Sequence, residues 1–415
     1  MAETFLFIAK TEPSYLSTKP LDSLLKMTMF FLRRPWAVKS PHLRAKFGQL
    51  IMFVFLPSEE LVNSERWSSN LPINGPNRFL LDNLAEAASF LAPALLLLYG
   101  DVEKTGYQEK ISHRRCILTV LKYIWKLSSH RGAFRSIAQI SVSSSVGSQT
   151  DDTSDYFIRF ANGLLNETNA LVISTIEKLQ EIKKIQTQMQ NPQAWAAISE
   201  EDRSQSNDRL QAAEEHVKAY AGLCHETVHM VNLLTSDAII LQRFLSGELL
   251  PRVASMVLHM LRNLVGSKSL DIKVDHMEQY GFDPKRMLQD VCITLAHFSV
   301  SEEFRKETVS NGYYDGGLPL QKAVSTVSKL KILNSDDFIL LSSFLDGVKA
   351  TEKNVISLSS LSSEAPEEFL DQLLYTIMRD PVRLPTSGNI LDRLTISQHL
   401  LNDETGMYVV YLMTY

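Results

Sequence analysis

Apolar side chains recur at intervals of three and four residues along most of this chain, whereas the strict alternation typical of a half-buried strand is scarce. Such intervals return to one face of an α-helix, which has 3.6 residues per turn. The longest stripe runs from Phe157 to Met189, about nine turns, before Asn191-Pro192 ends it. We expect helices over 21–32, 43–55, 79–91, 111–127, 157–189, 204–234, 249–264, 284–298, 320–330 and 336–350.

The two longest of these helices, 157–189 and 204–234, are separated by a short join, which predicts an antiparallel pair. Segment 141–155 is rich in Ser, Thr, Gly and Asp and is expected to be a loop, and 357–365 to be a serine-rich linker. The chain carries no strict sequence repeat. Successive helices with Pro, Gly and Ser joints favour a mainly α, elongated, armadillo-like helical solenoid.

Composition and charge argue against several classes of function for this chain. The net charge of −5 gives no basic excess for nucleic acid or anionic lipid. The most apolar stretch, Leu91–Tyr99, is shorter than the about 20 residues that a membrane helix needs, so we expect a buried helix and no membrane insertion. The three cysteines, Cys116, Cys224 and Cys292, are far apart, as in reduced intracellular proteins.

The C-terminal part of the chain carries the most specific pattern. It comprises Pro366–Asp371, Leu373–Pro385, Asp392-Arg393, Ile396 and His399–Asn402. This run resembles the opening of a U-box, the zinc-free relative of the RING domain. The resemblance implies a small α+β module that recruits ubiquitin-charged conjugating enzymes and has no catalytic residue of its own.

The preceding helices resemble the core of the ubiquitin conjugation factor family of chain-elongating U-box ligases. The motifs, in the family's order, are Ser40–Lys46, Leu91–Leu95, Tyr99–Gly106, Leu121–Trp125, Ser129–Arg131, Phe160–Glu167, Gln193–Trp195 and Tyr280–Lys285. The resemblance implies extension of polyubiquitin chains on substrates for proteasomal degradation. It also implies a hexameric AAA-ATPase segregase as partner, work in protein quality control including ER-associated degradation, a location in cytoplasm and nucleus, and no cofactor.

On this resemblance the chain divides into a partial helical core (1–356), the linker (357–365), the N-terminal part of a U-box (366–405) and an apolar tail (406–415) unlike the family. We expect the chain to begin inside the core and the U-box to be truncated before its closing helix. That truncation predicts weak ligase activity. The alternative is a non-catalytic helical scaffold that binds the segregase or substrates.

A RING domain is held together by zinc on Cys and His ligands, but no cysteine follows Cys292. Hydrogen bonds and ion pairs must therefore hold the module, and the candidates are Asp380, Asp392, Arg393 and His399. No metal is expected. By position in the family pattern, the residues that dock the conjugating enzyme are Leu373, Tyr375, Arg379 and Pro381.

A second motif points to different chemistry. His225-Glu226-Thr227-Val228-His229 fits the H-E-x-x-H pattern of zinc proteases, in which two His at i and i+4 bind zinc and the Glu activates water. Glu248 or His259 could supply the third ligand. Because the pattern specifies only three positions and lies within an apolar helical stripe, core packing is the favoured interpretation, and the metalloprotease is a remote alternative.

Overall fold

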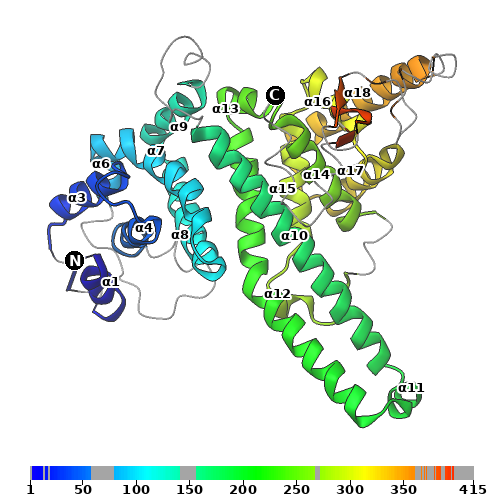
Figure 1. The fold of residues 1–415 in the computed structure, drawn as a ribbon, viewed down its shortest axis with the longest axis horizontal. Helices are drawn as coiled ribbons and strands as arrows, with labels where there is room; N and C mark the ends of the chain where they lie inside the picture. Colours follow the sequence, from blue (N-terminus) through cyan, green and yellow to red (C-terminus); the bar gives the residue numbers. More distant parts are fainter. Residues whose placement is uncertain are drawn as a thin grey trace.

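The computed structural model is an elongated array of helices (Figure 1). It describes residues 2–12, 15–16, 19–57, 79–140, 156–266, 272–359, 366, 369, 371, 378, 380–384, 388–393 and 395–396. Within these ranges the only strands are two short ones near the C-terminal end. The predicted fold class, a mainly α helical solenoid followed by a small α+β module, is confirmed.

The N-terminal helices form one group, at the left of Figure 1. They are α1 (Ala2–Thr11), α3 (Asp22–Leu32), α4 (Pro41–Phe55), α6 (Leu80–Asn83), α7 (Ala85–Asp101), the 3-10 turn η2 (Val102–Lys104), α8 (Tyr107–Lys126) and α9 (Ser128–Ile140).

Helix α7 lies at the centre of this group. With η2 it spans Ala85–Lys104 and is long and apolar enough to cross a membrane by composition, but half of its most apolar window is buried inside the protein. Leu91, Leu95 and Tyr99 are fully buried, and the helix packs against α3, α4, α8 and α9. These contacts are those of a core helix, as predicted.

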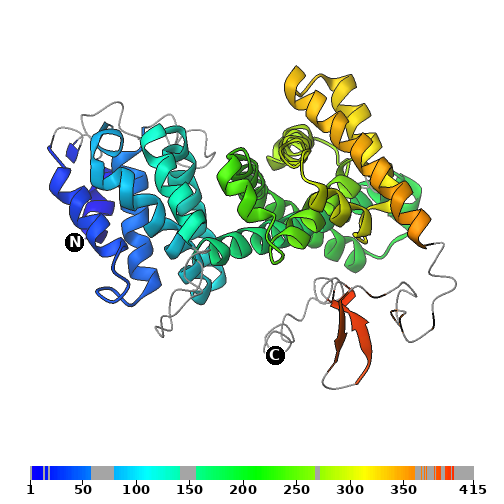
Figure 2. The same cartoon turned by 90° about the horizontal axis from the view of Figure 1, so that it is seen from above.

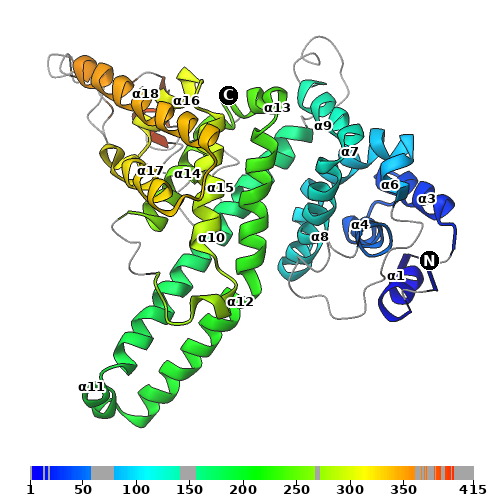
Figure 3. The same ribbon diagram turned by 180° about the vertical axis from the view of Figure 1, so that it is seen from behind.

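Two long helices connect the N-terminal group to the rest of the chain. Helix α10 (Tyr156–Met189) and helix α12 (Glu200–Thr235) pack along each other as an antiparallel pair, with the short α11 (Pro192–Ala197) at the tip. Figures 1 and 3 show the tip of this pair, around α11, projecting beyond both groups of helices. The buried stripe of α10 follows the predicted spacing. Its packing along α12 confirms the predicted antiparallel pair.

The remaining helices form a second group against α12, which Figure 2 shows as successive stacked elements. They are α13 (Ala238–Phe244), α14 (Leu250–Leu264), η4 (Met277–Tyr280), α15 (Pro284–His297), α16 (Glu302–Ser310), η5 (Asp315–Gly317), α17 (Leu318–Leu330) and α18 (Ser335–Ser359).

Five of the described helices, α1, α9, α11, α13 and α16, were not predicted from the periodicity. Their start signals were nevertheless present in two cases. The Asp237 carboxylate accepts the backbone N–H groups of Ile239 and Ile240 at the start of α13. The Ser301 hydroxyl accepts the N–H of Phe304 at the start of α16. Such N-caps satisfy donors that a helix otherwise leaves unpaired.

The predicted linker begins too early. Helix α18 continues through Ser359, so residues 357–359 are helical, and 360–365 lie outside the described residues. Serine has a helix propensity only about 0.5 kcal/mol worse than alanine, so a serine-rich turn at the end of an established helix is tolerated. The predicted loop 141–155 and the tail 406–415 also lie outside the described residues.

Candidate functional site

The C-terminal segment contains an antiparallel hairpin, drawn in red in Figure 2. Strand β1 (Pro381–Arg383) pairs with β2 (Ile390–Asp392), with Val382 opposite Leu391. The Leu384 N–H donates to the Asn389 carbonyl at 2.8 Å, and Gly388 takes a positive φ of 72° in the connecting loop. Glycine adopts that conformation without the Cβ strain of other residues, which lets the chain reverse direction here.

Four polar side chains tie the base of this hairpin together. The Arg393 Nε donates to Asp380 Oδ2 at 2.6 Å, and the Arg393 N–H donates to the Asp380 carbonyl at 2.9 Å. The Asp380 N–H donates to Asp392 Oδ2 at 3.3 Å. The Asp392 N–H in turn donates to Asp371 Oδ2 at 2.7 Å. The residues just before β1 and just after β2 are therefore joined through both side chains and backbone.

These contacts differ in strength. Asp380 and Arg393 are about 60% exposed, and exposed ion pairs contribute little because water screens them. The hydrogen bond to Asp380 raises the pKa of Arg393, so the guanidinium stays charged. Asp371 is fully buried, and a hydrogen bond to a buried carboxylate contributes about 1.5–3 kcal/mol. Asp371 is therefore the main polar anchor of the hairpin.

The sequence predictions for this region have mixed outcomes. Asp380, Asp392 and Arg393 are brought together, whereas His399 lies outside the described residues. Asp371 was missed as an anchor, although an acidic residue within the apolar run around Phe369 was a usable signal.

The docking residues are less completely described. Pro381 is exposed at the start of β1, and Leu373, Tyr375 and Arg379 lie outside the described residues. Ile390 is 38% exposed, whereas the neighbouring Leu391, on the other face of the strand, is 7% exposed.

The H-E-x-x-H motif lies in α12, but its side chains are engaged elsewhere. His225 Nε2 accepts the Asp283 N–H at 2.9 Å, which joins α12 to the start of α15. His229 contacts Asp290 at 3.0 Å, and Glu226 pairs with Lys122. Among the described residues, neither His belongs to a group of three metal-ligating side chains within 4.8 Å of one another. The motif therefore joins helices, and core packing is its better interpretation.

None of the three cysteines is poised for covalent chemistry. Cys116, Cys224 and Cys292 are buried, and burial raises the pKa of each thiol to about 12. Because the thiolate is the nucleophilic form, these thiols are unreactive near neutral pH.

The described structure is thus a helical array that carries a small hairpin, linked by carboxylate hydrogen bonds, near its C-terminal end. Comparison with known families assigns both parts. The ubiquitin elongating factor core matches residues 1–349, and the U-box domain matches residues 365–406. The chain belongs to the ubiquitin elongating factor core family.

Relatives of known name match along almost the whole chain. A probable ubiquitin conjugation factor E4 of Arabidopsis thaliana is 28% identical over 97% of this chain and 37% of its own length. The E4 ubiquitin-protein ligase UFD2 of Saccharomyces cerevisiae is 29% identical over 97% of this chain and 40% of its own. The chain thus spans a little over a third of the length of these relatives.

Proposed function

We propose that this chain is a U-box ubiquitin transferase that positions a ubiquitin-charged conjugating enzyme so that polyubiquitin chains are extended on substrates. The observation that carries the proposal is the U-box match over 365–406, at a hairpin tied together by Asp371, Asp380, Asp392 and Arg393. The family membership of the helical core supports it independently.

The reaction itself needs no nucleophile from this chain. A lysine amine of the acceptor attacks the thioester carbonyl, the isopeptide bond forms, and the conjugating enzyme's thiol leaves. A covalent ubiquitin intermediate on Cys116, Cys224 or Cys292 is disfavoured because their thiols are buried and protonated. The contribution of this chain is therefore to hold the thioester and the amine close together and correctly oriented.

The docking surface in this proposal is segment 373–381, which ends at the start of β1. Leu373 and Tyr375 supply apolar contact to the conjugating enzyme, and Arg379 and Pro381 complete the docking set. A docking loop must be rigid, because a loosely held surface loses binding energy to ordering. In this proposal the buried Asp371 is the main source of that rigidity, the exposed Asp380–Arg393 pair contributes less, and His399 is a further candidate for the same role.

Partners and location belong to the same proposal. Ubiquitin, its conjugating enzyme and ubiquitinated substrates follow from a U-box transferase, and the names of the relatives support this. We also propose a hexameric AAA-ATPase segregase as a partner, a role in protein quality control that ends in proteasomal degradation, and a location in the cytoplasm and nucleus. An extended helical array offers a long surface for such large partners.

The test is single-turnover discharge of ubiquitin from a panel of charged conjugating enzymes onto free lysine, with and without the full chain. We expect the chain to accelerate discharge from at least one enzyme. Leu373→Ala should remove roughly 10-fold or more of that acceleration, as loss of a central interface contact does. Ile339→Ala, which truncates an exposed apolar side chain on α18, is the matched control and should change nothing.

Two results would count against the proposal. If no enzyme in the panel discharges faster with the chain present, the non-catalytic scaffold becomes the better description. If discharge is accelerated equally by Leu373→Ala and Ile339→Ala, the U-box loop is not the docking surface.

A further inference from the structure

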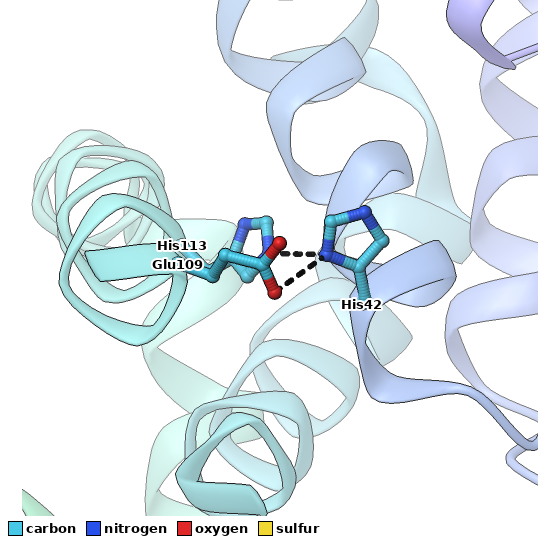
Figure 4. A group of neighbouring side chains, drawn as sticks. All are labelled: His42, Glu109 and His113. Carbon is cyan, nitrogen blue, oxygen red and sulfur yellow. Dashed lines mark hydrogen bonds and ion pairs between the residues drawn. The ribbon is translucent and has the colours of Figure 1, made fainter. Parts of the chain in front are cut away.

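Two helices of the N-terminal group bring a carboxylate and two imidazoles together, far from the U-box. His42 lies in the first turn of α4, while Glu109 and His113 lie four residues apart on one face of α8 (Figure 4). His42 Nδ1 is 3.3 Å from His113 Nε2 and 3.2 Å from Glu109 Oε2. All three potential ligand atoms lie within 4.8 Å of one another.

We propose that His42, Glu109 and His113 form a binding site for a divalent transition metal of the zinc class, which clips α4 to α8. The inference is independent of the proposed transferase function. Histidine nitrogen and carboxylate oxygen are ordinary zinc ligands, and three protein ligands leave a fourth position for water.

The separations fit such an ion. Ligand atoms about 2.0–2.1 Å from a tetrahedral zinc lie about 3.3 Å from one another. The two distances from His42 Nδ1, 3.2 and 3.3 Å, match that spacing. The Glu109 side chain is 54% exposed and has the freedom to close the third side of the triangle.

Hydrogen bonds among the three side chains do not satisfy all of their lone pairs. A single proton on His42 Nδ1 makes one good hydrogen bond, to Glu109 or to His113, whereas a cation accepts lone pairs from all three groups at once.

The surroundings give His113 an orienting partner and also a penalty for the metal. The Gln49 amide lies 3.5 Å from His113 Nδ1, and with its oxygen turned to the ring it would accept the Nδ1 proton of a metal-bound imidazole. Lys46 lies near His113, and its positive charge opposes a bound cation. The site is held by rigid elements, because α4 begins at the Ser40 cap and packs along α8.

The first test is binding of Co²⁺ and Zn²⁺ to the metal-free full chain, measured by equilibrium dialysis and by the visible absorption of bound Co²⁺. We expect one ion per chain and a tetrahedral-type Co²⁺ spectrum. His42→Ala and Glu109→Gln should each weaken binding at least tenfold. Both residues are partly exposed, so these variants are expected to fold, and circular dichroism checks this even if the buried His113→Ala fails.

Controls separate the site from unspecific binding. His276→Ala removes an exposed histidine paired with Glu278 and should leave binding unchanged, as should His225→Ala in the H-E-x-x-H motif. Lys46→Gln should tighten binding several-fold because it removes the opposing charge. The proposal is overturned if no stoichiometric ion binds, or if His42→Ala retains full affinity.

Discussion

A buried ion-pair network between α8 and α10 allows one prediction to be worked out in detail. The Arg114 guanidinium, 2% exposed, pairs with the buried Glu167 of α10 and with Glu103 Oε2 at 2.5 Å. It also lies 4.5 Å from the centroid of the Tyr99 ring. Although burial by itself lowers the pKa of Arg114, its interactions with Tyr99, Glu167 and Glu103 raise it, so the charge persists in the core.

The perturbation is Glu167→Leu, which leaves the buried arginine with Glu103 as its remaining carboxylate. Breaking a buried ion pair costs about 3–5 kcal/mol, because one charge stays desolvated without its partner. Glu103 is 56% exposed and continues to compensate, so we take about 3 kcal/mol, the lower end of that range. Since 1.4 kcal/mol is a factor of ten in an equilibrium constant, this cost raises the equilibrium constant for opening roughly 100-fold.

The assay is hydrogen–deuterium exchange of peptides from α8 and α10 in the native chain. Exchange through openings that separate these helices should accelerate roughly 100-fold in Glu167→Leu. The control Glu302→Gln removes a carboxylate that pairs with Lys306 at 2.6 Å on the surface of α16, and it should leave both helices unchanged.

A double variant tests the physical cause. Arg114→Met with Glu167→Leu removes both charges and should restore most of the protection, because apolar side chains of similar volume replace a buried pair well. The reasoning is refuted if Glu167→Leu exchanges within about threefold of the wild type, or if the double variant is no better protected than Glu167→Leu.

Three further predictions concern single sites. Leu391→Ala should cost about 2–5 kcal/mol in the hairpin and abolish accelerated ubiquitin discharge, while the melting of the helical core stays unchanged. Burial lowers the pKa of His225 to about 4, below its value of about 6.5 in the unfolded chain, so the unfolded state binds more protons between these values. The contribution of His225 to stability should therefore fall by about 3 kcal/mol as the pH drops from 6.5 to 4, and urea unfolding of His225→Gln should show a shallower pH dependence. Iodoacetamide at pH 8 should leave Cys116, Cys224 and Cys292 unmodified in the native chain and label all three in urea, and rapid native labelling would contradict their burial.

The helical character of this chain could be predicted from its sequence because periodicity is a local property. The long stripes of α10 and α12 predicted both helices and their antiparallel pairing. The helices α1, α9, α11, α13 and α16 were not predicted, although α3 and α17, of 11 and 13 residues, were found from their period. Caps such as Asp237 and Ser301 are the local signals that would have found two of them.

At the candidate site, the sequence predicted the kind of module but not which side chains are buried. The residue types around Pro381 were sufficient to indicate a U-box, and the lack of cysteine indicated a frame of charged groups. Which carboxylate is buried could not be predicted, because burial depends on what packs over a side chain. Asp371 therefore emerged as the anchor only from the fold, and the hairpin register decided that Leu391, rather than Ile390, faces inward.

By itself, then, the sequence determined the helical class, the order of the long helices and the family pattern at the C-terminal end, all of which depend on neighbouring residues or on matched motifs. Only the tertiary structure decided which side chains meet across long separations. It gave His225 a backbone partner at Asp283 in place of a metal, and it brought His42 to Glu109 and His113. The physical reason is that hydrogen bonding and metal ligation need atoms within about 3 Å of each other. Packing brings residues from different helices that close, and their spacing along the chain does not predict it.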